Sequence, residues 1–211
     1  MRPTHFLAFS AGICVGTQVG LRQGHRRQPR PWPVLWAPLL DHPWRLRYRD
    51  PVRTLGPFGI APGSQVVDLG CGTGTFTVEM ARQVGQEGRV HAVDLQAPMV
   101  QRARERLEQA GLLARVQLHH ATAYRLPLDD ESVDLVIAIA TLVEIPDPGM
   151  VLAEIHRVLR PGGRLAISEE LPHPGYVPAW VARRWLTAAG FRFGGQQRTP
   201  LCYSLLYFKA E

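Results

Sequence analysis

The segment that most constrains this 211-residue chain is VVDLGCGTGTF, Val66 to Phe76. Three glycines fall within five positions there, directly after a run of aliphatic residues. Glycine weakens both strands and helices, because it loses more backbone freedom on folding than other residues do. A loop between a buried strand and a helix avoids that cost, and the missing Cβ atoms let a ligand approach the backbone. A tight turn without a ligand is the alternative.

From about Gly63 onward, short apolar runs alternate with amphipathic helical patterns, which is typical of a parallel sheet with crossover helices. The expected elements are strands 65–70, 89–95, 116–121, 133–140 and 164–170 and helices 76–85, 97–111, 149–163 and 177–190. The last segments, FRFGGQQRT and CYSLLYFK, are joined by only two residues, Pro200 and Leu201, which indicates an antiparallel hairpin. The predicted fold class is therefore α/β, a doubly wound and mostly parallel sheet of seven strands with a C-terminal antiparallel hairpin.

The net charge of +6 is unevenly distributed. Residues 1–53 hold nine arginines and two acidic residues, which gives +7 and leaves −1 for the rest of the chain. We predict an apolar leader and basic arm over 1–30, a strap rich in proline and tryptophan over 31–61, and the main domain over 62–211. A basic arm can contact phosphates of lipid or nucleic acid, whereas an arginine-rich composition without a partner is equally compatible with the sequence.

The apolar part of the leader, Phe6 to Leu21, is shorter than the roughly 20 residues of a membrane-spanning helix. Peripheral contact with a membrane through residues 1–30 therefore stays open. The three cysteines, Cys14, Cys71 and Cys202, are far apart and predict neither a disulfide framework nor a metal site. We expect a cytoplasmic protein, with membrane association as the open addition.

The glycine spacing distinguishes between two kinds of nucleotide ligand. A pyrophosphate-binding loop has the pattern G-x-G-x-x-G, but here Thr75 occupies the sixth position. Asp68, two residues before Gly70, would repel a pyrophosphate and would suit a ligand with an amino group. Asp94 ends the second strand, where a carboxylate can accept hydrogen bonds from ribose hydroxyls.

The motifs together resemble those of the class I S-adenosylmethionine-dependent methyltransferases, in particular the small-molecule group that includes the quinone-biosynthesis enzymes (methyltransferase type 11). The resemblance covers about Pro62 to Glu170 and the hairpin. It rests on VVDLGCGTG, AVDL, ATAYRLPLDDESVDLV and EIPDPGMVLAEIHRVLRPGGRLAISE. It implies a Rossmann-like methyltransferase fold, S-adenosylmethionine as cofactor, and a methyltransferase domain over 62–211.

The resemblance also implies roles for individual residues. The glycine loop would take the methionine part of the cofactor, Asp68 its amino group, Asp94 the ribose, and Leu95 the adenine. The family usually has Gly-Asp-Ala where this chain has Ala121, Thr122 and Ala123, so a neutral hydroxyl replaces the carboxylate that receives the adenine amino group. The expected cofactor-binding residues are Asp68, Gly70, Cys71, Gly72, Gly74, Asp94, Leu95, Thr122, Ala123 and Ala140.

Methyl transfer needs a base only where the acceptor must lose a proton. Glu144 follows the fourth strand at the ligand side, and we expect it to be a substrate contact or the catalytic base. An exposed or helix-capping carboxylate is the alternative for this residue. The family often has paired histidines where this chain has Val143 and Glu144, so no histidine role is transferred. No metal is expected.

The expected activity is methyl transfer from S-adenosylmethionine to a small-molecule or lipidic acceptor by in-line displacement. Two alternatives remain, an RNA or protein methyltransferase that uses the basic arm and a non-catalytic cofactor-binding scaffold. Nucleic acid is the less favoured partner, because no aromatic and basic recognition module is present. The chain offers only Leu171 to Val177 as a lid after the fifth strand. We therefore expect residues 30–55 to fold over the cofactor mouth.

Overall fold

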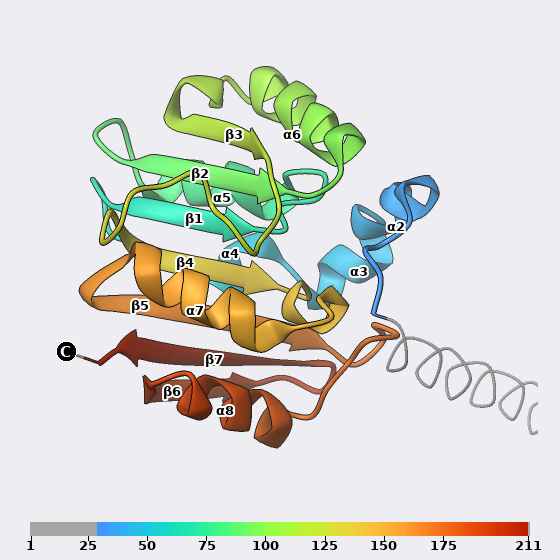
Figure 1. Cartoon of the computed structure of the whole chain (residues 1–211). Helices are drawn as coiled ribbons and strands as arrows, with labels where there is room; N and C mark the ends of the chain where they lie inside the picture. The colour runs from blue at the N-terminus through green and yellow to red at the C-terminus, as the bar shows by residue number, and fades with distance from the viewer. Residues whose placement is uncertain (1–28, 211) are drawn as a thin grey trace, which may run out of the picture.

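The structure is a computed structural model that describes residues 29–210. The apolar runs form one sheet with the order β3-β2-β1-β4-β5-β7-β6. The strands are β1 Gln65–Leu69, β2 Arg89–Asp94, β3 Val116–His120, β4 Val133–Ile139, β5 Leu159–Glu170, β6 Phe191–Arg198 and β7 Cys202–Lys209. Strands β1 to β5 are parallel, and β7 pairs antiparallel with both β5 and β6. The predicted fold class is confirmed (Figure 1).

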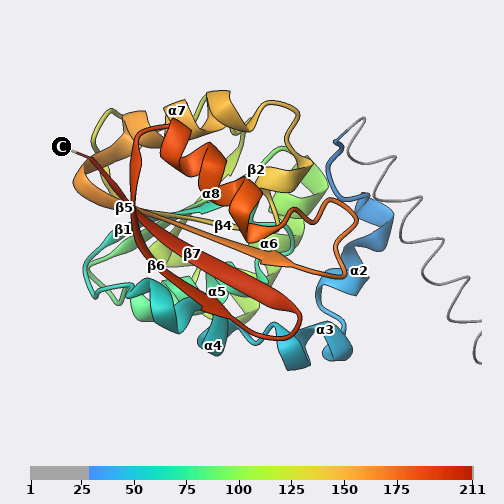
Figure 2. The same cartoon turned by 90° about the horizontal axis from the view of Figure 1, so that it is seen from below.

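Helices cover both faces of the sheet (Figure 2). One core cluster joins the sheet to α7 and α8, and a second joins it to α4, α5 and α6. The helices of the main domain are α5 Thr75–Gln83, α6 Ala97–Gln109, α7 Pro148–Val158 and α8 Ala179–Ala188, with short 3-10 turns η3 Leu113–Arg115 and η4 Leu142–Glu144. The apolar stripes of the sequence therefore correspond to two packed layers around the sheet.

Helix α7 ends earlier than its sequence pattern predicts. The expected helix extended to Gly163, but the last helical residue is Val158. Leu159 pairs with Val133 of β4, and the register shifts before the pairing resumes at Arg164. The chain thus joins β5 at once, because a strand pairing distant in sequence replaces the last turn of the helix.

Residues 29–58 contain most of the strap predicted over 31–61, and from here on "the strap" means residues 29–58. They run along the carboxyl edge of the sheet and onto the α5 face (Figure 1). They form short helices and not the extended segment that prolines alone would suggest: η1 Val34–Trp36, α2 Ala37–Leu40, α3 Pro43–Tyr48, α4 Pro51–Leu55 and η2 Gly56–Phe58. Prolines stand in the first turns of α2, α3 and α4, where no backbone N–H is needed. Asp50 caps α4 by accepting a hydrogen bond from Arg53 N at 2.9 Å.

The C-terminal end of the strap packs into the hydrophobic core of the main domain. Leu55 and Phe58 are fully buried and belong to the cluster beneath α5. Arg164 of β5 donates hydrogen bonds to the carbonyls of Phe58 and Gly59, at 2.9 and 3.0 Å. This end of the strap is therefore fixed by apolar burial as well as by polar contacts.

The predicted apolar leader, with Phe6 to Leu21 and Cys14, lies outside the described residues. Of the predicted arm over 1–30, only Pro29 and Arg30 are described. Within the described part of the chain, no helix is both long enough and apolar enough to cross a membrane.

Candidate functional site

A cavity of about 360 Å³ lies between the strap and the carboxyl ends of the parallel strands. Its walls come from the β1–α5 loop, from the ends of β2, β3, β4 and β5, and from the strap. Ligands of doubly wound sheets bind at this edge, where the connections diverge to opposite faces. The fold therefore brings the strand ends that carry the predicted site residues together at this cavity.

The glycine loop forms the floor of this cavity. Gly70 and Gly72 have φ values of +74° and +53°, which L side chains rarely adopt. The N–H groups of Gly70 and Cys71 both donate to the carbonyl of Val93 on β2, at 2.8 and 3.0 Å. A Cβ at Gly70 would lie 2.4 Å from Thr141 Oγ1. The loop therefore needs glycine at Gly70 for its own packing as well as for an approaching ligand.

Gly74 differs from the other two glycines because it does not line the cavity. A Cβ at this position would meet Cα and Cβ of Ala103 at 3.0 Å each. Its φ of +79° turns the chain into the first residue of α5. The structure thus gives Gly74 a role in packing α5 against α6, and its contact with a cofactor remains a prediction.

Asp94 lies at the end of β2 and faces the cavity. Its two carboxylate oxygens accept hydrogen bonds from Gly72 N at 2.9 Å and Gln96 N at 2.8 Å. Burial raises the pKa of Asp94, although these two backbone donors oppose the increase. The carboxylate is therefore held in a fixed position with lone pairs left for a hydroxyl-bearing ligand.

Asp68 lines the same cavity from β1 and is almost completely buried. Thr77 Oγ1 donates to its Oδ2 at 2.5 Å. Burial raises the pKa of Asp68 to about 7, and the charge of Asp94 adds to this effect, whereas the Thr77 bond opposes it. A bound cation would favour the ionised form, so the position suits an amino group.

The adenine-side residues expected from the sequence also lie at the cavity. Leu95, Thr122 and Ala123 all line it, and Leu95 is 55% exposed. Thr122 Oγ1 accepts a hydrogen bond from Tyr124 N at 3.3 Å. Their location agrees with the expected adenine contact, which remains a prediction.

Two other expected residues, Cys71 and Ala140, also line the cavity. Burial raises the pKa of the Cys71 thiol well above its usual value, so this group is not an activated nucleophile. Ala140 has a φ of +55°, which is uncommon outside glycine, and its N–H donates to the Ser168 carbonyl at 2.8 Å. The backbone directly after β4 is therefore held in a strained conformation at the site.

Glu144 points to the cavity from η4 and is held by two donors. Trp32 N donates to its Oε2 and His173 Nε2 to its Oε1, each at 3.0 Å. Gly175 N donates to His173 Nδ1 at 2.9 Å, which places the ring proton on Nε2 and assigns the tautomer. The Trp32 and His173 rings also lie 5.6 Å apart, so Glu144 joins the strap to the loop after β5.

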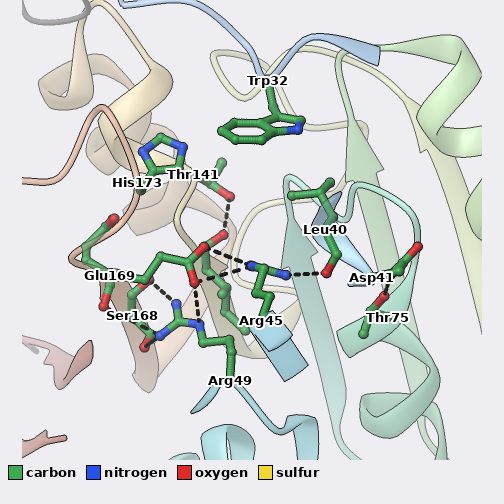
Figure 3. A network of polar contacts seen from close by, with 12 residues as sticks. Trp32, Leu40, Asp41, Arg45, Arg49, Thr75, Thr141, Ser168, Glu169 and His173 are labelled. Carbon is green, nitrogen blue, oxygen red and sulfur yellow. Dashed lines mark hydrogen bonds and ion pairs between the residues drawn. The ribbon is translucent and has the colours of Figure 1, made fainter. Parts of the chain in front are cut away.

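The strap contributes charged residues that were not among the predicted site residues. Asp41 accepts hydrogen bonds from Thr73 and Thr75 of the glycine loop and pairs with Arg106 at 2.6 Å. Arg45 pairs with Glu170 at the end of β5 at 3.0 Å and lines the cavity. Figure 3 shows Arg45 below Trp32 and between Leu40 and the end of β5.

Arg49, one turn further along α3, is 1% exposed and donates to Ser168 Oγ and Ser168 O at 2.9 Å each. Its Nε and the Oε2 of Glu169 are buried without a hydrogen-bond partner. The sequence signal for these contacts is the four-residue spacing of Arg45 and Arg49, which places both guanidinium groups on one helix face toward the acidic pair that ends β5.

A nucleoside with a charged amino-acid tail fits these residues. A buried carboxylate at the end of β2 suits ribose hydroxyls, and Asp68 suits an ammonium group. Among the described residues, no cluster of histidine, cysteine, aspartate or glutamate could hold a metal ion.

Comparison with known proteins agrees with this assignment. Residues 66–163 match the model of a methyltransferase domain. A crystal structure of a SAM-dependent methyltransferase from Aquifex aeolicus is similar with a TM-score of 0.80 and 29% identity, over 85% of this chain and 100% of that one. Residues 66–163 therefore form a methyltransferase domain of the class I S-adenosylmethionine-dependent type. The cofactor of such domains is S-adenosylmethionine, which the cavity is suited to hold.

Two curated proteins are similar to part of this chain. A demethylmenaquinone methyltransferase from Lactiplantibacillus plantarum is 35% identical over 130 residues, which are 61% of this chain and 55% of that protein. The ubiquinone/menaquinone biosynthesis C-methyltransferase UbiE from Teredinibacter turnerae is 40% identical over 111 residues, 53% of this chain and 45% of that protein. The chain spans about half the length of these relatives.

Proposed function

We propose that this protein transfers a methyl group from S-adenosylmethionine to a small apolar acceptor of the quinone type. The observation that carries the proposal is a single cavity with a ribose-type carboxylate, an acid for an amino group and a third, oriented carboxylate, Glu144. The curated relatives are named for methylation of demethylmenaquinone and for C-methylation in ubiquinone and menaquinone biosynthesis. Those names support the acceptor class.

The residues that line the cavity would hold the cofactor. Asp94 would accept hydrogen bonds from the ribose, Asp68 would pair with the ammonium group, and the backbone at Gly70 and Gly72 would contact the methionine part. The remaining expected contacts are Cys71, Leu95, Thr122, Ala123 and Ala140. When bound, the cofactor supplies a methyl group on a positively charged sulfur. The protein's own part is to align the acceptor and to exclude water with the strap.

Glu144 is the proposed catalytic base. Methylation of a ring carbon is favoured when a neighbouring hydroxyl loses its proton, and a ring proton must leave after the carbon–carbon bond forms. Its carboxylate is oriented by Trp32 N–H and by His173, and it has lone pairs free to receive a proton from a bound acceptor. His173 is a positioning residue in this scheme, because its tautomer is set by Gly175.

The substitution Glu144→Gln tests this role. We expect turnover to fall about 100-fold, as for loss of a general base, while affinity for S-adenosylhomocysteine changes less than threefold. Glu105→Gln, on the exposed face of α6, is the control and should leave both measurements unchanged. Normal turnover in the Glu144 variant would contradict the role.

The acceptor class needs a separate experiment. The purified chain is incubated with methyl-labelled cofactor and with fractionated lipid, quinone, RNA and protein extracts, beside Asp94→Asn as a binding-deficient control. We expect label in the apolar small-molecule fraction and none with the control. Label in RNA or protein would favour the alternative methyltransferases. Failure to bind S-adenosylmethionine and S-adenosylhomocysteine in calorimetry would favour a scaffold.

We also propose that the protein is cytoplasmic and meets a membrane surface peripherally through residues 1–30. A lipidic acceptor partitions into membranes, and this segment combines apolar residues with arginines. Binding of the purified protein to anionic vesicles, lost on deletion of residues 1–30, would support the contact. Equal binding before and after the deletion would contradict it.

A further inference from the structure

The charges that line the cavity are strongly one-sided. Four carboxylic acids face it, Asp68, Asp94, Glu144 and Glu170. Among the described residues that line it, Arg45 is the only arginine, and none is lysine. A ligand with a carboxylate at one end therefore has a single described cation with which it can pair.

The order of the strands indicates where that end of the ligand lies. Asp94 ends β2, and the adenine-side residues Thr122 and Ala123 follow β3, the edge strand beside it. A ligand with its ribose at Asp94 and its base toward β3 extends its other end across β1 and β4 toward β5. Arg45 and Glu170 stand at the end of β5.

Arg45 has hydrogen-bonding capacity left for such a group. Its Nε donates to Glu170 at 3.0 Å, its Nη1 donates to the Leu40 carbonyl at 2.7 Å, and its Nη2 lies 3.0 Å from Glu170 Oε1. A guanidinium has five N–H donors, so these contacts leave two available. Glu170 keeps a second cation, because Arg49 Nε lies 3.8 Å from its Oε2.

We propose that Arg45 binds the α-carboxylate of the cofactor's methionine part, so that the strap and not the sheet supplies the cation of the site. This inference rests on the proposed function. It makes cofactor binding and closure of the strap one event, because Arg45 belongs to α3 and bonds to Leu40 of α2. Figure 3 shows this arrangement, with Arg45 set between the strap backbone at Leu40 and the end of β5.

The test compares two ligands that differ only in the carboxylate, S-adenosylhomocysteine and its decarboxylated analogue S-adenosyl-3-thiopropylamine. Binding of each to the full chain is measured by calorimetry in wild type, Arg45→Gln, Arg45→Lys and Arg47→Gln. Arg47 is the matched control because it is exposed on the same helix and does not line this cavity. In wild type we expect the carboxylate to improve affinity by tenfold to about a hundredfold, as charge-assisted hydrogen bonds do.

In Arg45→Gln this preference should fall to less than threefold, Arg45→Lys should retain an intermediate preference, and Arg47→Gln should behave as wild type. A wild type that binds both ligands equally would overturn the inference without any variant. A preference that persists in Arg45→Gln would overturn it as well. A wild type that binds neither ligand would instead reject the proposed function, so the two failures are distinguishable.

Discussion

The two walls of the cavity are built by different means. The sheet wall is made by backbone, with left-handed glycines, two N–H groups on the Val93 carbonyl and apolar layers on both faces. The strap wall is held mainly by charged side chains, through Asp41, Arg45 and Arg49. Apolar burial fixes the strap near Leu55 and Phe58, and Ala37 is the other fully buried apolar residue among its described residues.

The sheet wall is therefore preformed by the backbone, whereas the strap wall depends on side-chain contacts. Backbone bonds and packed glycines cannot rearrange without disrupting the sheet, so the sheet wall is rigid before a ligand arrives. Substitutions can remove the side-chain contacts of the strap one at a time without changing the backbone of the sheet. The proposed methyl transfer would use both walls, because the sheet wall would align the cofactor and the strap would exclude water.

The largest expected effect comes from a methyl group added to the rigid wall. In Gly70→Ala the new Cβ would lie 2.4 Å from Thr141 Oγ1, and the residue would keep a φ of +74°. Left-handed backbone costs about 1–2 kcal/mol outside glycine, and overpacking adds about 1–3 kcal/mol. We expect the free energy of unfolding, measured by denaturant titration, to fall by about 3 kcal/mol.

Gly111→Ala separates these two contributions. Gly111 has a similar φ of +67°, but nothing lies within 4 Å of its added Cβ. This variant should lose only about 1 kcal/mol, the backbone part alone. Equal losses in the two variants would show that the contact with Thr141 adds nothing and that the sheet wall is less rigid than described.

Most of the fold could be predicted from the sequence because its signals are local. Strand and helix periodicity and the glycine loop identify the parallel units, and the very short join identifies the hairpin. The end of α7 at Val158 could not be predicted, because it depends on the pairing of Leu159 with Val133, 26 residues earlier in the chain. The packing of Gly74 could not be predicted for a similar reason, since its neighbour Ala103 belongs to another helix.

The two walls of the site differ in the same way. Asp68, Asp94 and Glu144 could be found because acids at or just after the carboxyl ends of parallel strands meet at one edge of the sheet. The spacing of Arg45 and Arg49 is visible in the sequence, but their partners could not be predicted, because Glu170 and Ser168 lie about 120 residues away along the chain. The excess of arginine is visible in the sequence. Which arginines are buried depends on where the short helix α3 packs against the sheet, and the sequence does not show this.

A second prediction concerns the hold of the strap on the glycine loop. Burial alone would raise the pKa of Asp41, but hydrogen bonds from Arg106 and Thr75 and the charge of Arg106 outweigh burial and lower it. Asp41→Asn removes this charge-assisted contact, which we expect to cost about 1–2 kcal/mol. Trypsin should then cleave the strap faster, and affinity for S-adenosylhomocysteine should fall about threefold to tenfold.

Asp134→Asn is the control for that prediction. Asp134 pairs with Arg160 at 2.8 Å with comparable exposure, but it lies at the start of β4, away from the strap. Its loss should lower overall stability without faster cleavage of the strap and without a change in affinity. If both variants release the strap equally, the effect reflects general destabilisation and Asp41 is not a specific anchor.

The smallest expected effect tests the buried seam where Arg49 of the strap meets β5. Burial raises the pKa of Glu169 to about 8, the charge of Arg49 opposes this increase, and Glu170 and Glu144 add to it. The folded state therefore binds a proton that the unfolded state has released, so this group's contribution to stability declines from about pH 5 to pH 8 and then levels off. Glu169→Gln mimics the protonated acid. Its free energy of unfolding should match that of wild type near pH 4, below both pKa values, and exceed it by a margin that grows up to about pH 8, with other groups cancelling in the difference. A difference that stays the same from pH 4 to pH 9 would mean that Glu169 titrates as a solvated acid and that the strap does not seal this edge of the sheet.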